Sequence, residues 1–341
     1  MKACVIHAPR DLRIEEAEVP ALGPRSVKLR IGAGGICGSD LHYYQDGGFG
    51  TVRIKQPMIL GHEVAGTVIE IGSEVTAVKV GDRGAINPNQ PCGACAQCLA
   101  GRANTCLDVR FYGSAMRFPH VQGAFREILV ADERQVFTIP DHISLGQAAF
   151  AEPLAVCLHA VTRASTVAGK RVLVTGVGPI GALTILAARC FGAREIVATD
   201  VAALPLKTAA LIGADRVVNV ATESLADYGA NKGTFDVLIE CSGNARALAS
   251  GLDVVRPGGT IVQLGLGGEF DLNVNTIVAK ELELRGSFRF HEEFGWAVDY
   301  ISRGVIDVSP LLTDTIPLAE AQRAFDLAGD KAQAMKVHLS F

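Results

Sequence analysis

Aromatic residues and long apolar runs are both scarce in this sequence. Aromatic side chains make up 6% of the 341 residues, and there is one Trp. No stretch of about eighteen consecutive apolar residues occurs, so we expect no membrane-spanning helix. Charge of one sign is also lacking, since 32 basic and 36 acidic residues give a net charge of −4. That balance offers no electrostatic case for nucleic acid as a partner.

The chain is too long for one compact core, which favours two domains. Up to about residue 137 the pattern is short strands and Gly/Pro turns, typical of a compact β-barrel-like domain. Strands and helices then alternate, which predicts a doubly wound parallel sheet and an α/β fold class. The C-terminal segment is expected to return to the first domain. We therefore predict one domain from residues 1–152 and 290–341, and a second from residues 153–289.

Nine cysteines are present, and four of them crowd into one short segment. The first ten residues, MKACVIHAPR, have too short an apolar stretch for a signal peptide, so we expect a cytoplasmic protein. In such a protein clustered cysteines favour a metal over disulfides. Two residues separate each of the first three cysteines and seven separate the third from the fourth, which predicts a closed structural zinc site on Cys92, Cys95, Cys98 and Cys106.

A second, open metal site is predicted from Cys37, His62 and a carboxylate. His62 lies in Gly-His-Glu, between an apolar run and an alternating strand-like segment. Glu152 precedes Pro153, which pushes it out of helical geometry and lets its carboxylate point into a cleft. A solvated glutamate at a helix start and a turn histidine are the alternatives. Three protein ligands would leave a fourth position for water or a substrate oxygen.

Ser39 and His42 follow Cys37 closely and could carry a proton away from such a site. Ser39 would place a hydroxyl at the substrate, and His42 would place an imidazole toward solvent. Without the zinc context, a turn hydroxyl and a surface histidine are the simpler interpretations.

A G-x-G-x-x-G sequence at Gly176, Gly178 and Gly181 lies between a predicted strand and a predicted helix. The next strand ends at Asp200, whose carboxylate can hydrogen-bond the ribose hydroxyls of an adenosine and would repel a 2′-phosphate. NAD is therefore favoured over NADP, although use of both stays open. To the same cofactor site we assign further residues of the loop and of later strand ends, namely Pro179, Ile180, Leu264, Gly265 and Ser287.

Taken in order along the whole chain, these motifs resemble the zinc-dependent medium-chain dehydrogenases. The run from Cys37 to Tyr44 is similar to the polyol branch, which acts on sorbitol and xylitol. Other segments resemble the L-idonate 5-dehydrogenase subfamily. They are residues 111–116, 118–120, 286–290 and 329–331.

The resemblance implies a GroES-like catalytic domain joined to a Rossmann domain. It implies one catalytic and one structural Zn²⁺ per chain, with Glu63 ranked above Glu152 as the direct ligand and Glu152 able to exchange into the shell. It also implies proton transfer through Ser39 and His42, and a homodimer or homotetramer formed through the Rossmann domain.

The implied reaction is the reversible NAD-linked oxidation of L-idonate at C5 to 5-ketogluconate. Polyol contact would come from Tyr43 and Arg289. The aldonate carboxylate needs a cation, since an unpaired charge in a cleft is costly. Arg289 is the first candidate because it follows a strand at the edge where ligands bind; the others are Arg110, Arg117 and His120.

Two alternatives remain open at this point. One is a sorbitol- or xylitol-type polyol dehydrogenase on the same scaffold. The other is a non-catalytic zinc- or nucleotide-binding protein, which the acidic balance and the second metal set argue against.

Overall fold

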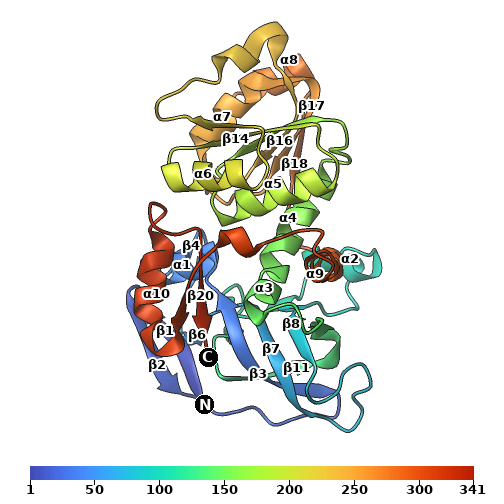
Figure 1. Cartoon of the computed structure of the whole chain (residues 1–341), viewed down its shortest axis with the longest axis vertical. Coiled ribbons are helices and arrows are strands. Elements are labelled where there is room, and N and C mark those ends of the chain that lie inside the picture. Colours follow the sequence, from blue (N-terminus) through green and yellow to red (C-terminus); the bar gives the residue numbers. More distant parts are fainter. The chain divides into compact units, whose positions relative to one another are not determined.

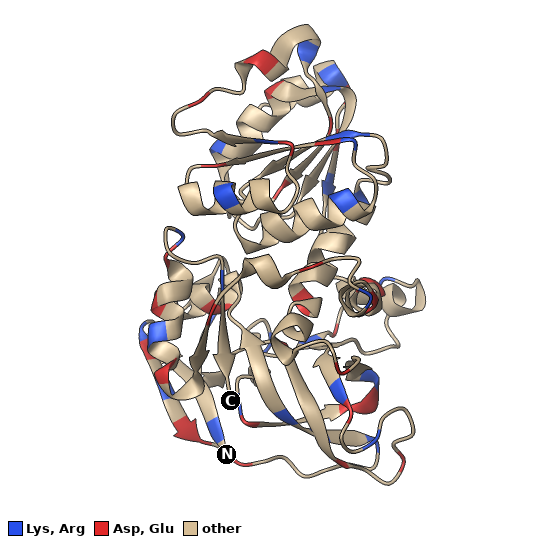
Figure 2. Ribbon diagram, in the orientation of Figure 1, with Lys and Arg blue, Asp and Glu red and all other residues tan.

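The computed structural model describes all of residues 1–341 and divides into two compact units (Figure 1). Unit 1 comprises Met1–Glu152, Phe294–Asp330 and Lys336–Phe341. Unit 2 comprises Pro153–Glu293 and Lys331–Met335. Basic and acidic residues are interspersed along the ribbon of each unit (Figure 2). No helix combines the length and the apolar character needed to cross a membrane.

Unit 1 is built on a seven-stranded sheet with the order β12-β8-β7-β3-β20-β19, in which β11 also pairs with β3. The strands are β3 (Ser26–Gly35), β7 (Glu63–Ile71), β8 (Arg83–Ile86), β11 (Ile128–Asp132), β12 (Val136–Thr138), β19 (Leu312–Pro317) and β20 (Lys336–Ser340). β19 and β20 come from the C-terminal segment, and β20 pairs with β3. The predicted return of the chain to the first domain is confirmed.

Smaller strands and the helices complete unit 1. The strands are β1 (Lys2–Ala8), β2 (Asp11–Glu16), β4 (Gly48–Phe49), β5 (Val52–Arg53), β6 (Met58–Ile59), β9 (Asn89–Gln90) and β10 (Arg110–Phe111). The helices are α1 (Gly38–Asp46), α2 (Ala96–Leu99), α3 (Leu145–Ala149), α9 (Glu293–Ser302) and α10 (Ala321–Gly329).

Strand β3 shows why this sheet can hold a site. Val27, Leu29 and Ile31 are buried on one face, as their alternation with polar residues predicts. The glycine-rich segment that follows was expected to end the strand, but β3 continues to Gly35. A Cβ atom on Gly35 would lie 2.3 Å from Glu63 Oε2, so the glycine leaves room for a functional side chain on the neighbouring strand.

Unit 2 contains a six-stranded parallel sheet with the order β15-β14-β13-β16-β17-β18. This order confirms the predicted doubly wound sheet. The strands are β13 (Arg171–Thr175), β14 (Glu195–Asp200), β15 (Arg216–Asn219), β16 (Phe235–Glu240), β17 (Val255–Gln263) and β18 (Glu283–Gly286). Helices α5 (Pro179–Cys190) and α6 (Ala203–Leu211) cover one face, and α7 (Ala245–Val254) and α8 (Val274–Lys280) cover the other (Figure 1).

Only β8 forms within residues 75–86, where Lys79 and Asp82 close a turn through reciprocal hydrogen bonds. One local prediction was wrong in position. The helix break expected at Glu152 lies at Phe150 instead. Helix α4 (Ala151–Arg163) begins one residue later and carries Glu152 and Pro153 in its first turn, a position that proline tolerates.

Candidate active site

Cys37 stands at the end of β3 and the start of helix α1. It is the N-cap of α1, with extended backbone angles, and its backbone N–H donates to Asp40 Oδ2 at 3.1 Å. A sulfur atom at a helix N-terminus is well placed to carry negative charge. The Cys37–Asp40 hydrogen bond at the start of α1 therefore restrains the backbone that carries the thiol.

Asp40 joins this helix start to the loop that carries His62. Its Oδ1 atom accepts a hydrogen bond from Gly61 N at 3.1 Å and lies 3.9 Å from His62 Nδ1, and the residue is fully buried. Asp40 therefore lies behind the His62 ring and ties the loop of Gly61 to the start of α1. Sequence reasoning gave Asp40 no role, although it lies in the same Cys-Gly-Ser-Asp motif.

The ligand atoms of Cys37, His62 and Glu63 lie within 4.8 Å of one another. His62 and Glu63 are buried, and His62 Nδ1 and Glu63 Oε1 have no hydrogen-bond partner, whereas Glu63 Oε2 is ion-paired with the buried Lys336. Buried polar atoms left this way are costly unless a further group satisfies them. A sulfur, an imidazole and a carboxylate form a donor set that suits zinc and leaves one position open. The residues present therefore fit a catalytic zinc ion.

Burial dominates the proton chemistry of this cluster. It raises the pKa of Cys37 to about 12, with the Glu63 charge adding to the effect. Burial also raises the pKa of Glu152 to about 8, against the opposing effect of His62. Glu152 is 5% exposed but does not belong to the converging ligand set. A metal ion would lower the cost of charging these groups, because it would supply the missing positive charge.

Two residues of β20 that sequence reasoning missed also belong to this site. Lys336 is buried, forms an ion pair with Glu63, and donates to Ile36 O at 2.9 Å. Burial opposes its charge, but Glu63 and Cys37 raise its pKa overall. His338 is fully buried, and burial lowers its pKa to about 3, so the ring is neutral. The Lys-x-His alternation on a strand at the chain's end was the signal that could have found them.

Ser39 and His42 are three residues apart on α1, a spacing that places both on one side of the helix. Ser39 is half-buried and His42 is exposed. His42 Nδ1 lies 3.7 Å from Asp46 Oδ2. This gradient from buried to exposed matches the two ends of a proton path.

The residues expected to meet substrate differ in their surroundings. Tyr43 is buried, and its phenol oxygen accepts a hydrogen bond from Ala115 N at 3.0 Å. His120 Nε2 accepts a hydrogen bond from Lys55 N at 2.8 Å, and its Nδ1 lies 2.7 Å from Arg117 O, so the ring joins two loops. Both ring nitrogens of His120 therefore already have partners within the chain. Arg117 forms an ion pair with Asp108, and Arg110 is exposed.

Arg289 has an unusual backbone conformation just beyond β18. Its φ is +54°, in the left-handed region that non-glycine residues rarely adopt. The guanidinium stacks on the Phe288 ring at 5.0 Å, and the residue is half-buried. Backbone strain of this kind concentrates at functional sites.

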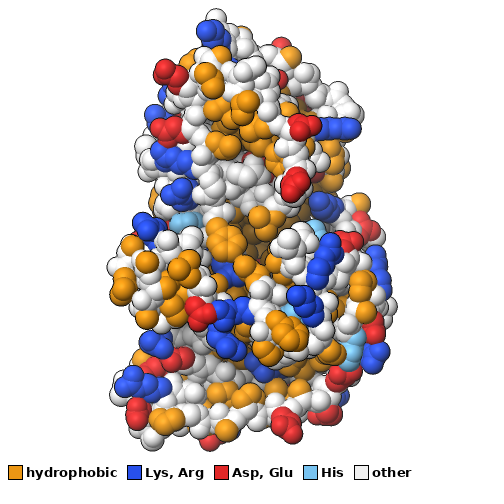
Figure 3. Space-filling model, turned by 180° about the vertical axis from the view of Figure 1, so that it is seen from behind, with side chains coloured by type: hydrophobic (Ala, Val, Ile, Leu, Met, Phe, Trp, Pro, Cys, Tyr) orange, Lys and Arg blue, Asp and Glu red, His pale blue; other side chains and the backbone are white.

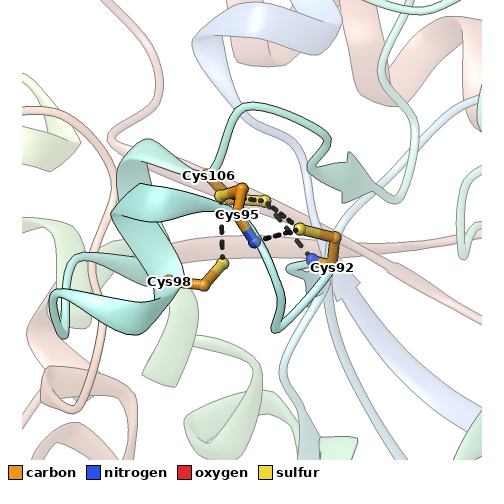
Figure 4. Close-up of side chains that lie close together, drawn as sticks. All are labelled: Cys92, Cys95, Cys98 and Cys106. Carbon is orange, nitrogen blue, oxygen red and sulfur yellow. Dashed lines mark hydrogen bonds between the residues drawn. The ribbon is translucent and has the colours of Figure 1, made fainter.

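The four clustered cysteines point toward one another from the loop around α2 (Figure 4). The sulfur–sulfur distances are 3.6 Å for Cys95–Cys98, 3.8 Å for Cys95–Cys106 and 3.5 Å for Cys92–Cys106. Four sulfurs bound at about 2.3 Å to a tetrahedral zinc stand roughly 3.8 Å apart. Backbone hydrogen bonds from Cys98 and Leu107 lower the pKa of Cys95 to about 6. The cluster therefore fits a structural zinc ion.

The glycine-rich loop of unit 2 has the geometry that a pyrophosphate requires. Gly176 adopts a φ of +76°, and a Cβ atom on Gly181 would lie 2.0 Å from Gly176 O. A Cβ atom on Gly178 would meet nothing within 4 Å, so the N-terminus of α5 is open to a ligand. Pro179 and Ile180 begin that helix. In dinucleotide-binding loops the first glycine allows a tight turn, the second lets the backbone approach the pyrophosphate, and the third allows close packing of helix and strand.

The other predicted cofactor residues lie at the carboxyl ends of the same parallel strands. Asp200 ends β14 and accepts hydrogen bonds from the backbone N–H groups of Val177 and Val201 at 2.8 and 2.7 Å. Leu264 and Gly265 follow β17. Ser287 follows β18, and its buried hydroxyl has no partner. This edge of the sheet is where doubly wound folds bind ligands.

Comparison with known proteins identifies both units. Residues 23–141 match the alcohol dehydrogenase GroES-like domain, and residues 179–303 match the zinc-binding dehydrogenase domain. The chain is 42% identical over 341 residues to L-idonate 5-dehydrogenase (NAD(P)(+)) of Escherichia coli. The aligned region covers 100% of this chain and 98% of that relative. It is 38% identical over 334 residues to sorbitol dehydrogenase of Bacillus subtilis, and that aligned region covers 96% of this chain and 93% of the relative.

Solved structures give the same result. The crystal structure of L-idonate 5-dehydrogenase from Escherichia coli superimposes with a TM-score of 0.97 at 42% sequence identity, covering 100% of this chain and 98% of that one. A zinc-binding dehydrogenase of Sinorhizobium meliloti bound to NADP superimposes with a TM-score of 0.90 at 31% identity, covering 100% and 99%.

The four-cysteine cluster yields a first prediction. We expect Cys98→Ser to reduce the zinc content from about two ions per chain to about one and to lower the free energy of unfolding by about 4 kcal/mol, because three thiolates no longer close the coordination sphere. Zinc content is measured by atomic absorption and stability by thermal melting. Cys190→Ser, at an exposed position on α5, is the matched control. Two zinc ions per chain in Cys98→Ser would contradict the assignment.

Proposed function

The chain belongs to the zinc-dependent medium-chain dehydrogenases, and from that premise we propose that it oxidises L-idonate at C5 to 5-ketogluconate with NAD, and catalyses the reverse reduction. The observation that carries the proposal is the convergence of Cys37, His62 and Glu63 within 4.8 Å. The full-length identity of 42% to an L-idonate 5-dehydrogenase supports the substrate.

We assign catalysis to residues 1–152 and 290–341 and cofactor binding to residues 153–289. In this assignment Cys37, His62 and Glu63 would hold the catalytic zinc, and the buried Glu152 would be a further carboxylate available to it. When bound, zinc would supply a Lewis acid for the alcohol oxygen, and NAD would supply the two-electron acceptor. Lys336 restrains Glu63 through their ion pair.

Proton release falls to α1 in this mechanism. The Ser39 hydroxyl takes the alcohol proton and passes it toward the His42 ring, which exchanges with solvent because it is exposed. The neighbouring Asp46 carboxylate lies 3.7 Å from His42 Nδ1, at the solvent-facing end of this path. Tyr43 borders this helix face and orients the hydroxyl groups of the substrate.

A carboxylate distinguishes an aldonate from a polyol, and Arg289 is the cation we assign to it. Three observations support this choice: both ring nitrogens of His120 have partners within the chain, Arg117 is paired with Asp108, and Arg110 is exposed. The left-handed backbone and the stacking on Phe288 hold the guanidinium in one orientation. A planar guanidinium binds a carboxylate through two parallel hydrogen bonds.

A homodimer or homotetramer formed through unit 2 is part of the proposal. Strand β18 is an edge strand, with one unpaired side. Large apolar side chains are exposed in this unit, including Val278 at 75% and Leu284 at 46% exposure. Figure 3 shows apolar side chains gathered on one face of the unit. Pairing of two edge strands would cover exposed backbone and apolar surface together. We also propose a cytoplasmic location, where a four-thiolate zinc site is stable.

The substrate comparison tests the proposed function. Initial rates of NADH formation are measured on L-idonate, sorbitol, xylitol and D-gluconate at matched concentrations. We expect the highest kcat/KM on L-idonate. D-gluconate carries the same carboxylate with the opposite configuration at C5, so it separates recognition of the charge from recognition of the reacting carbon. A clear preference for sorbitol or xylitol would instead assign the chain to the polyol enzymes, an alternative that the 38% identity to a sorbitol dehydrogenase supports.

Arg289 provides a second prediction. We expect Arg289→Gln to lower kcat/KM for L-idonate by roughly 10- to 100-fold, because a charge-assisted bond to the carboxylate is lost. The value for sorbitol should change little. Arg117→Gln, at an arginine that is already paired, is the matched control. Equal losses on L-idonate and sorbitol would show that Arg289 does not read the carboxylate.

Asp200 provides a third prediction, on cofactor choice. We expect Asp200→Ala to raise KM for NAD about tenfold, because the hydrogen bonds from the carboxylate to the ribose hydroxyls are lost. KM for NADP should stay unchanged or fall, because the charge that repels its 2′-phosphate is removed as well. Asp215→Ala is the control, since Asp215 bonds Ile196 N at the opposite edge of the sheet. An unchanged ratio of the two KM values in Asp200→Ala would overturn the assignment of NAD specificity.

A further inference from the structure

Glu240, the last residue of β16, is a buried carboxylate that the mechanism described above does not use. It is 0% exposed and forms no ion pair with a basic side chain. A carboxylate in such a place is stable only if several hydrogen-bond donors surround it. Glu240 stands at the carboxyl edge of the sheet, the same edge as Gly176 and Asp200.

The donors around the Glu240 side chain come from three segments. Ser242 donates through its backbone N–H at 2.8 Å and through its hydroxyl, and Gly243 N donates at 2.9 Å. Gln263 Nε2 donates at 2.7 Å and also reaches Gly265 O at 2.8 Å. Thr175, which precedes the glycine-rich loop, donates more weakly at 3.4 Å. The carboxylate therefore joins the ends of β13, β16 and β17.

The backbone carbonyl of Glu240 adds to this network. It accepts hydrogen bonds from Leu264 N at 2.9 Å and from Gly265 N at 2.8 Å. Both of these residues are predicted to contact the cofactor. One residue thus holds the loop after β17 with its main chain and its side chain together.

The loops joined by Glu240 are packed backbone to backbone. A Cβ atom on Gly176 would lie 2.4 Å from Ser242 Cβ, and one on Gly265 would lie 2.1 Å from Gly243 N. No side chain fits between them. A shift of residues 241–243 would therefore displace both the pyrophosphate loop and the loop after β17.

We propose that Glu240 is a positioning residue for the nicotinamide cofactor, which it serves by fixing the loop of residues 241–243 between the two loops that contact the cofactor. The inference rests on the proposed NAD-linked function. The carboxylate oxygens hold the loops as acceptors, because two backbone N–H groups and the Gln263 amide donate to them. An amide at this place would turn its own N–H₂ group toward Gly243 N–H and Gln263 Nε2, and the donors would repel one another.

The test is the dissociation constant of NADH, measured by fluorescence titration of the purified protein without substrate. We expect Glu240→Gln to raise this constant about tenfold or more. The rise in turnover assays should be confined to KM for NAD, with kcat at saturating NAD retained. Asp236→Asn is the matched control, because Asp236 lies on the same strand at the opposite edge and bonds Arg171 N and Arg256.

Gln263→Leu is a second variant in case Glu240→Gln does not fold, and it should weaken NADH binding in the same direction. All constants are measured well below each melting temperature. Unchanged NADH binding in a folded Glu240 or Gln263 variant would overturn the inference. Equal weakening by Asp236→Asn would also overturn it, by showing a general effect of stability. Failure of the unaltered protein to bind NADH would instead contradict the proposed function itself.

Discussion

A buried group of anionic metal ligands is stable only when a cation balances it, and the catalytic unit depends on that requirement. Strands β3, β7 and β20 bring Cys37, His62, Glu63 and Lys336 to one point inside the sheet. Burial raises the pKa of Cys37 because the thiolate has no solvent there. The Lys336 ammonium balances part of the charge, and a zinc ion would balance the rest. Gly35 at the end of β3 leaves space for that group, because a Cβ atom there would meet Glu63, Lys336 and His338.

Unit 2 is subject to a different constraint, the close approach of its loops to a ligand, and it also meets that constraint with glycines. Its parallel strands all end at one edge, and the loops that follow must approach a pyrophosphate closely enough for backbone N–H groups to bind it. Glycines at positions 176, 243 and 265 allow that approach, but they supply no side chains that could hold the loops together. We propose that Glu240 makes this connection through its hydrogen bonds to the loop of residues 241–243. Each unit thus has one buried charged residue beside its candidate site, Lys336 in unit 1 and Glu240 in unit 2.

The sequence was sufficient where local pattern and chemistry coincide. The spacing of Cys92 to Cys106 and the strand–loop–helix context of Gly176 predicted the metal cluster and the dinucleotide loop, because each lies within one short segment. It was insufficient where distant segments meet. Lys336 lies 300 positions from Ile36, to whose carbonyl it donates, so the local Lys-x-His pattern does not reveal which site its strand reaches. His120 seemed available for a substrate carboxylate until its two hydrogen bonds were visible.

The most direct test of the central claim is the Cys37→Ser variant, examined for zinc content, NADH affinity and turnover on one preparation. We expect about one zinc ion per chain, an NADH dissociation constant close to that of the unaltered protein, and no measurable oxidation of L-idonate. That combination would separate a catalytic zinc site from an intact cofactor site. Retained turnover with one zinc ion fewer, or loss of NADH binding together with turnover, would contradict the account.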